Sequence, residues 1–269
     1  MTWQVIARQD SRVTLQSRSV KLLLGLLSFG VLAVAYLYPV TGQEPITTAR
    51  FTGTVTGWLK TGVPLVGILL GYNAIVSERE SGALLLSLSL PHSRRDVLLG
   101  KYAGRTGLVA ATILATMAGA GFLVVYPYGD LEVVRSLSFV ALTVCFGALW
   151  TGVGLAVSLS VATKRRALVL GFGTLALFVF FWGTLGDLLR LGFDALGVGD
   201  GGLPAPAQFV LHLSPNRAFQ LVTDGFIDPS ASVGGPWYLS EWAALVVFLA
   251  WLVGPLGLAA RRFAGRDLS

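Results

Sequence analysis

The sequence has 269 residues, of which 54% are hydrophobic and only 13% carry a charged side chain. Soluble proteins carry about 25% charged residues, so this chain lacks the polar side chains to cover itself in water, and a soluble globular fold is excluded. A net charge of +6 is expected in a lipid-embedded chain from basic loops on one side of the membrane, and no nucleic-acid partner is predicted.

Long apolar stretches recur along the chain and predict six membrane-spanning helices. A helix needs about 20 apolar residues to cross a hydrocarbon core about 30 Å thick, and the runs show no period of two that would favour a transmembrane barrel. Lys60 lies near the start of the second stretch. The sequence therefore predicts an all-α integral membrane protein with one transmembrane domain over residues 1–269. The predicted spans are residues 22–40, 55–76, 107–128, 137–162, 167–185 and 242–260.

Basic residues are divided unequally between the two sets of connections. Fifteen of the 20 lysines and arginines lie before the first span, between spans two and three, between spans four and five, or after the sixth. Lysine and arginine concentrate in cytoplasmic loops. The pattern predicts a multi-pass plasma-membrane protein with both termini in the cytoplasm.

The connection "SERESGALLLSLSLPHSRRDVLLGK" mixes charge and leucine between spans two and three. Ser81 is expected to begin a short helix that Pro91 ends, and Ser93 with Asp96 three residues later resembles a capping box that begins the third span. On the short helix, Leu84, Leu85 and Leu88 share a face. Charge lies at both ends of this element, at Glu78, Arg79, Glu80, Arg94 and Arg95.

Two interpretations of this element remain open. Its leucines would supply contact area to a cytoplasmic protein while the flanking charges set the register. Alternatively, the element lies on lipid as an interfacial amphipathic helix.

Residues 186–241 form the longest connection, which is predicted to be extracytoplasmic. Ser214 is expected to cap a short helix whose first residue is Pro215, and this helix is predicted to dip back toward the membrane. The acidic residues of the connection suggest contact with a cation, a lipid headgroup or an extracytoplasmic protein.

The sequence lacks recognisable residues for several kinds of chemistry. The Gly100–Lys101 pair is followed by Tyr102 and lacks the remainder of a phosphate-binding loop, so this chain is not expected to hydrolyse ATP. No metal-ligand cluster or catalytic pair is recognised. The span centres are nearly uncharged, which argues against a proton relay. Asn73 is the most polar deep residue, and it either pairs across helices or contacts a substrate.

The region "YNAIVSERESGALLLSLSLPHSRRDVLLGKY" resembles the segment between spans two and three of type-2 ATP-binding-cassette (ABC) permeases. The segment "LSPNRAFQLV", the basic start of the chain and the tail "RRFAGRDLS" resemble other parts of that family. Within it, "VPLVGILLGYNAIVSERESG" is most similar to permeases associated with nitrous-oxide reductase maturation. The shared features of the first region are Glu78, Glu80, Gly82, Ala83, Leu84, Pro91, Ser93, Arg94, Leu98, Leu99, Gly100 and Lys101.

The resemblance implies that the chain is a permease subunit of an exporter. Two permease copies would pair, and separate cytoplasmic ATPase subunits would bind beneath them and hold ATP and magnesium. A coupling helix between spans two and three would dock on the ATPase. Its residues would be Glu78, Arg79, Glu80, Gly82, Leu84, Leu85, Leu88, Pro91, Ser93, Arg94 and Arg95.

The resemblance further implies a cytoplasmic amphipathic helix over residues 1–20, lying along the inner membrane surface. Trp3 and Ile6 would form its apolar face, and Arg8 and Arg12 would meet either anionic lipid or the ATPase. Two alternative functions stay open at this point, a secondary transporter and a non-transporting membrane scaffold that docks a cytoplasmic protein.

Overall fold

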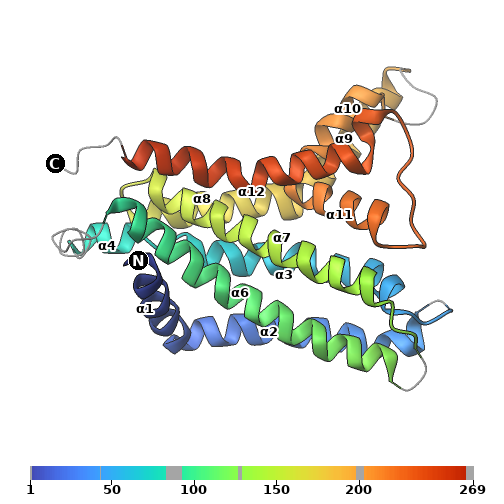
Figure 1. Ribbon diagram of the computed structural model, residues 1–269. Helices are drawn as coiled ribbons and strands as arrows, with labels where there is room; N and C mark the ends of the chain where they lie inside the picture. Colours follow the sequence, from blue (N-terminus) through green and yellow to red (C-terminus); the bar gives the residue numbers. More distant parts are fainter. Residues whose placement is uncertain (1, 43, 83–92, 127–128, 198–202, 265–269) are drawn as a thin grey trace.

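The computed structural model describes residues 2–42, 44–82, 93–126, 129–197 and 203–264, and these residues fold almost entirely as helices (Figure 1). In the described part of the chain, β-pairing is limited to one isolated bridge between Thr47 and Asp130. Within the described residues, six helical segments are long and apolar enough to span a membrane, which confirms the predicted fold class. They are α2 (Arg18–Thr41), α3 (Thr48–Gly71) with α4 (Val76–Glu80), α6 (Arg94–Val125), α7 (Val133–Ser160), α8 (Lys164–Leu175) continuing through η1 (Ala176–Phe181) into α9 (Trp182–Ala195), and α12 (Glu241–Ala264).

The second and third membrane helices begin earlier than the apolar runs suggested. The side chain of Thr47 accepts a hydrogen bond from the backbone N–H of Arg50 at 3.2 Å and so caps α3. Lys60 does not interrupt α3, because its ammonium donates to the side chain of Gln220 at 2.7 Å. The predicted capping box of Ser93 and Asp96 is confirmed, and it begins α6 at Arg94.

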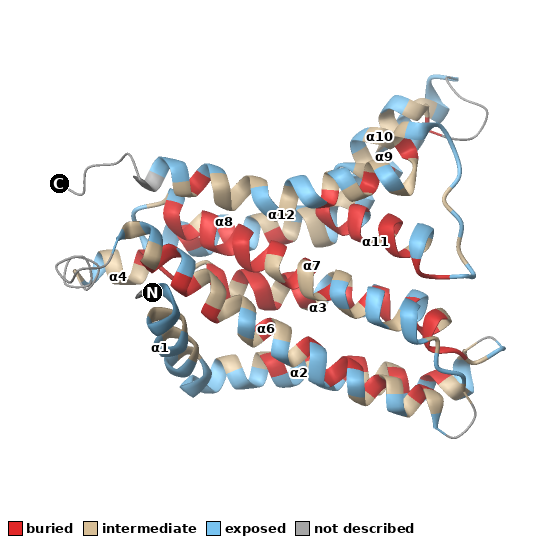
Figure 2. Ribbon diagram, viewed as in Figure 1, coloured by how far each residue is buried: buried red, intermediate tan, exposed pale blue. Residues whose placement is uncertain are grey.

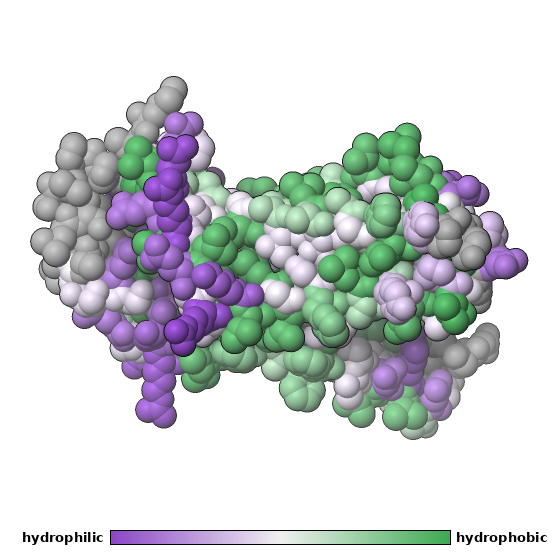
Figure 3. All heavy atoms as spheres, turned by 90° about the horizontal axis from the view of Figure 1, so that it is seen from below, coloured by the Kyte–Doolittle hydropathy of each residue, from purple (hydrophilic) through white to green (hydrophobic). Residues whose placement is uncertain are grey.

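The surface between the two ends of the bundle is apolar. Figure 3 shows a hydrophobic waist between two hydrophilic ends, and the hydrophilic residues gather most densely at one of them. Large apolar side chains such as Phe29, Val134 and Val253 are about 70% exposed or more. Exposed apolar surface on this scale is expected where lipid is the solvent.

The core lies between α3 and α7, whose facing surfaces are buried along much of their length (Figure 2). The two helices approach closely at Gly71 and Gly154, where a β-carbon built on Gly71 would lie 2.6 Å from the Cα atom of Gly154. Trp150, one turn earlier in α7, is fully buried, and a β-carbon built on Gly67 of α3 would lie 2.6 Å from it. Small residues permit such close backbone contact between membrane helices.

The two ends of the bundle differ in structure. At one end lie α1 (Thr2–Gln16), α4, the turn at residues 161–163 and the end of α12, and we call this the charged end (Figure 1). The opposite end holds α9, α10 (Ala205–His212) and α11 (Pro215–Phe226). The segments that the basic-residue pattern assigned to one side of the membrane therefore lie together.

The short helix predicted after Ser214 is α11. The Ser214 side chain accepts from the backbone N–H of Arg217 at 3.1 Å, and Pro215 is the first helical residue. The ring of Phe219 is fully buried and stacks on Phe146 of α7, with 4.2 Å between ring centroids. This stacking holds α11 against the core of the bundle.

Candidate docking site at the charged end

The second membrane helix breaks at residues 72–75 and resumes as α4. A break leaves backbone N–H groups without helical acceptors, and here Ser158 of α7 supplies one. Its hydroxyl oxygen accepts from the N–H groups of both Ile75 and Val76, each at 3.0 Å, and Ser158 is fully buried. The direction of α4 is therefore fixed by α7.

A network of ionised side chains ties α4 to α1 and α6. The ammonium of Lys101 lies 2.7 Å from the carboxylate of Glu78 and 3.2 Å from that of Asp10. Arg105, one turn further along α6, bonds the same Asp10 at 3.0 Å and also donates to the backbone carbonyl of Leu70. Lys101 is only 5% exposed, and buried charges of this kind require partners.

Asp10 shows the electrostatic character of this network. Burial by itself raises the pKa of the Asp10 carboxyl, but the adjacent Arg105 and Lys101 outweigh it and hold the pKa below the ordinary value of 3.8. The carboxylate is therefore ionised throughout the physiological range.

Two further contacts tie α4 to the turn between α7 and α8. A guanidinium N–H of Arg79 donates to the carbonyl of Val161 at 3.0 Å. The carboxylate of Glu80 accepts from the backbone N–H of Lys164, the first residue of α8, at 2.7 Å. Because consecutive residues of α4 bond different neighbours, the segment is connected to α1, α6, α7 and α8 together.

Helix α1 packs on α6 through its small and apolar residues. A β-carbon on Gly100 would lie 2.7 Å from Ile6, and one on Gly104 would lie 2.7 Å from the carbonyl oxygen of Ala7. Arg8 and Arg12 are exposed. Trp3 is 38% exposed, although its backbone also approaches Gly100. The amphipathic N-terminal segment is therefore a helix that packs on α6, and its exposed side chains are candidates for contact with the membrane surface.

The remaining candidate residues fall into three groups. Ser81 and Gly82 end α4, and Gly82 adopts a φ of 74°, a conformation that favours glycine. Arg95 is exposed in the first turn of α6, where Arg94 is partly buried. The predicted residues Ala83, Leu84, Leu85, Leu88 and Pro91 lie outside the described residues.

Asn73 lies in the break between α3 and α4, near the charged end of the second membrane helix. Its backbone carbonyl accepts from the hydroxyl of Ser77 at 2.8 Å. Its side-chain oxygen is buried and has no hydrogen-bond partner among the described residues.

Sequence reasoning did not single out Asp10, Lys101, Arg105 or Ser158 as members of a site. Two local signals were available. Asp10 is the only acidic residue before Glu44. Lys101 and Arg105 are also spaced by four residues and so share a helix face. Ser158 carried no local signal, since its acceptor role depends on a break in another helix.

Comparison with known proteins identifies the family of the chain. Residues 4–268 match the family described as ABC-2 family transporter protein. The chain belongs to that family. It is 29% identical over 284 residues to the probable ABC transporter permease protein NosY of Pseudomonas aeruginosa, a match that covers 98% of each chain. It is 28% identical over 234 residues to the protein of the same description from Stutzerimonas stutzeri, covering 84% of this chain and 83% of the relative.

The family covers nearly the whole chain, so the charged end belongs to an ABC-2 transporter. The contacts of Glu78, Arg79 and Glu80 show what connects the segment after the second membrane helix to the remainder of the bundle. Lys101, of the sequence pair Gly100–Lys101, forms ion pairs with Asp10 and Glu78.

Proposed function

We propose that this chain is the membrane-embedded permease subunit of an exporter that is driven by ATP hydrolysis in a separate cytoplasmic ATPase subunit. Its family and its two relatives described as permeases support the permease role. In this proposal ATP and magnesium are bound by the partner, and two permease copies pair within the membrane.

The observation that carries the proposal is the set of contacts made by α4. Glu78 bonds Lys101 of α6, Arg79 bonds the carbonyl of Val161 after α7, and Glu80 bonds the first backbone N–H of α8. A partner that binds residues 78–95 and moves them would therefore displace several membrane helices together. A solvated loop without such contacts would absorb the displacement.

Helix α1 extends the proposed docking surface. Arg8 and Arg12 are exposed at the same end of the bundle as α4. Their charges are available to acidic side chains of an ATPase, and also to anionic headgroups at the membrane surface. Substitution of both arginines with glutamine separates these roles. ATPase binding in neutral detergent should weaken if the arginines contact the ATPase, and it should stay unchanged if they contact only lipid headgroups.

The proposal is tested by purifying the chain from its native membrane and reconstituting it in vesicles. An ATPase subunit with a phosphate-binding loop should copurify with the intact chain. Deletion of residues 82–90 should abolish ATP-driven transport and ATPase copurification while the six spans still insert. Full transport by the deletion variant, or by the chain without an ATPase, would contradict the proposal.

Pairing of two copies is tested by disulfide crosslinking. The chain has one native cysteine, Cys145, so a Cys145→Ser background permits single engineered cysteines. The fifth membrane segment, Lys164–Ala195, buries the smallest share of its apolar stretch within the chain. Cysteines at exposed Phe180 or Leu188 should form crosslinks between equivalent positions of two copies, and crosslinks only to an unlike permease would contradict a homodimer.

A further inference from the structure

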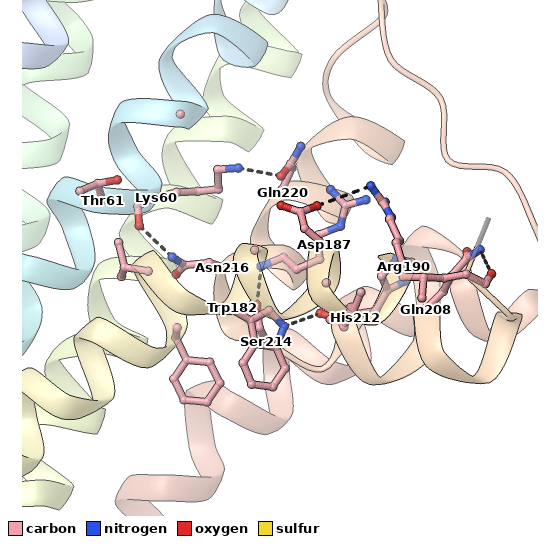
Figure 4. Close-up of a pocket in the computed structure, with 18 residues that line it drawn as sticks. Lys60, Thr61, Trp182, Asp187, Arg190, Gln208, His212, Ser214, Asn216 and Gln220 are labelled. Carbon is pink, nitrogen blue, oxygen red and sulfur yellow. Dashed lines mark hydrogen bonds and ion pairs between the residues drawn. The ribbon is translucent and has the colours of Figure 1, made fainter. Parts of the chain in front are cut away.

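A polar cavity of about 670 Å³ lies at the end of the bundle opposite α4, which we call the distal cavity (Figure 4). Its walls come from α3, η1, α9, α10 and α11. This volume falls within the range of about 300–1,000 Å³ that is usual for small-molecule sites. Its charged lining consists of Lys60, Asp187, Arg190 and Arg217.

Lys60 is a charged residue within a membrane helix, and its ammonium faces the protein. Nζ donates to the neutral side-chain oxygen of Gln220 on α11 at 2.7 Å, and no carboxylate in the described part of the chain lies within 4.0 Å of it. Asn216 of α11 donates to the backbone carbonyl of Lys60 at 2.9 Å (Figure 4). A charge kept in a membrane helix without an ion pair within 4.0 Å among the described residues indicates a functional role.

Arg217 supplies a second cation with no fixed partner. Its guanidinium forms no hydrogen bond or ion pair with any residue that the structure describes. Burial lowers the pKa of Arg217, Asp224 acts in the opposite direction, and the like charge of Arg190 lowers the pKa further. The guanidinium nevertheless remains protonated at neutral pH, so two cations lie near one another in the cavity wall.

One carboxylate, Asp187, lines the cavity, and a second, Asp224, acts on Lys60 and Arg217 from outside the lining. Asp187 lies 3.8 Å from Arg190, but both side chains are more than half exposed and such a pair is weak. Burial and the charge of Arg217 lower the pKa of His212, so His212 is neutral at pH 7. The lining thus carries three cations against one carboxylate.

Two features complete the cavity as a binding site. Helix α11 begins at its wall, and the positive end of a helix favours anions. Phe178 and Trp182 add aromatic surface to the lining, and Trp182 is fixed because its indole N–H donates to the carbonyl of Leu211 at 2.9 Å. The cavity is larger than an inorganic ion requires, and one side of it is suited to an apolar group.

We propose that the distal cavity binds a small organic anion, with its acidic group on Lys60 and Arg217 and its apolar part against Phe178 and Trp182. The side-chain oxygen of Asn216 is buried without a donor among the described residues, so a hydroxyl of the ligand or a water molecule would complete its hydrogen bonding. The inference deepens the proposed transport function and rests on it only in identifying the bound anion as cargo.

Binding is measured by calorimetry on the purified full chain in neutral detergent, without any ATPase. The probes are phenyl phosphate, inorganic phosphate and phenyltrimethylammonium, the last being a cation with the same ring. Phenyl phosphate should bind at least tenfold more tightly than either of the others. Equal affinity for phenyl phosphate and phenyltrimethylammonium would overturn the proposal.

Substitutions locate the site. Arg217→Gln and Lys60→Gln should each weaken phenyl phosphate binding about tenfold or more, and Arg217→Lys should restore most of the loss. Arg135→Gln is the matched control, because Arg135 is an exposed arginine of α7 outside the distal cavity, and it should leave binding unchanged. Unaltered binding in folded Arg217→Gln and Lys60→Gln variants would also overturn the proposal, and elution as a single species in size-exclusion chromatography establishes that they are folded.

A competition experiment identifies the source of the anion. Displacement of phenyl phosphate by phosphatidylglycerol, but not by phosphatidylcholine, assigns the cavity to an anionic lipid headgroup. Persistence of binding in excess phosphatidylglycerol assigns it to a free solute, and equal displacement by both lipids contradicts recognition of charge. Anion binding is measured without an ATPase, and transport is measured separately in vesicles. Anion binding without ATP-driven transport would contradict only the transport proposal. ATP-driven transport without anion binding would contradict only the proposal for the distal cavity.

Discussion

The ammonium of Lys101 lies between two carboxylates from different helices, 2.7 Å from Glu78 of α4 and 3.2 Å from Asp10 of α1. The lysine is nearly inaccessible to solvent. The carboxylate of Glu78 therefore contacts the transmembrane bundle, and the residues that follow Glu78 in the sequence begin the proposed docking segment. The side chain of Lys101 therefore links α1, α4 and α6.

Glu78→Lys should uncouple ATPase activity from transport. The substitution places a second ammonium against buried Lys101, and like charges at that distance repel strongly where water is scarce. We expect the six spans to insert and ATP hydrolysis to continue, while transport in reconstituted vesicles falls at least tenfold. Glu78→Gln, which keeps a hydrogen-bond acceptor, should lose less, and full transport by Glu78→Lys would contradict a coupling role.

Ser158→Ala should loosen the junction between α3 and α4. The buried N–H groups of Ile75 and Val76 would lose their shared acceptor, and a buried donor left unsatisfied costs about 1–3 kcal/mol. Thermal unfolding in detergent should occur at a lower temperature, with faster amide exchange at residues 75–80. Ser160→Ala is the control, because that exposed hydroxyl bonds only its own helix at Ala156, and equal unfolding temperatures for the two variants would contradict the assigned role.

The membrane fold was predictable because long apolar runs and uneven basic loops are properties of contiguous sequence. Helix starts were predictable where the cap is local, as at Ser93 and Ser214. The second span was predicted from residue 55, although α3 begins at Thr48. Lys60 made that start uncertain, and its partner Gln220 lies 160 residues away in the sequence. Distant partners of this kind leave no periodic pattern.

The charged end was found only in part for the same reason. Glu78, Arg79 and Glu80 stood out as a charged run, but the pairing of Lys101 with Asp10 joins residues 91 positions apart. A lone acidic residue in a basic segment and the four-residue spacing of Lys101 and Arg105 were the local indications. The distal cavity was not anticipated, since its cations come from three helices that meet only after folding.

Gly71→Ala should destabilise the bundle at the crossing of α3 and α7. The added methyl group would lie 2.6 Å from the Cα atom of Gly154, and the backbone at the contact would have to move apart, at a cost of about 1–3 kcal/mol. Gly57→Ala in the same helix is the control, because nothing lies within 4 Å of its β-carbon position. Thermal unfolding of the two variants in detergent measures the difference, and an unchanged unfolding temperature for Gly71→Ala would show that the crossing is not tightly packed.

Asp10→Asn should release α1 from α6. Lys101 and Arg105 would remain buried with less compensating charge, and removal of one partner from a buried pair costs about 3–5 kcal/mol. A loss of roughly 1–3 kcal/mol is expected here, because Glu78 still faces Lys101 and the Leu70 carbonyl still accepts from Arg105. Limited proteolysis should cut α1 faster in this variant than in Arg12→Gln, whose arginine is exposed.

The same carboxylate predicts how the docking of α1 depends on pH. Burial raises the pKa of Asp10, but Arg105 and Lys101 lower it more, so the folded-state pKa lies below the ordinary value of 3.8. A group with a lowered folded-state pKa contributes stability above its unfolded pKa and loses that contribution as the pH falls through the folded value. Protection of α1 from proteolysis by pepsin, which is active in acid, should therefore decrease below about pH 4 in the native chain. Asp10→Asn should lack this step because its side chain does not titrate, and an identical acid profile in both proteins would contradict the role assigned to Asp10.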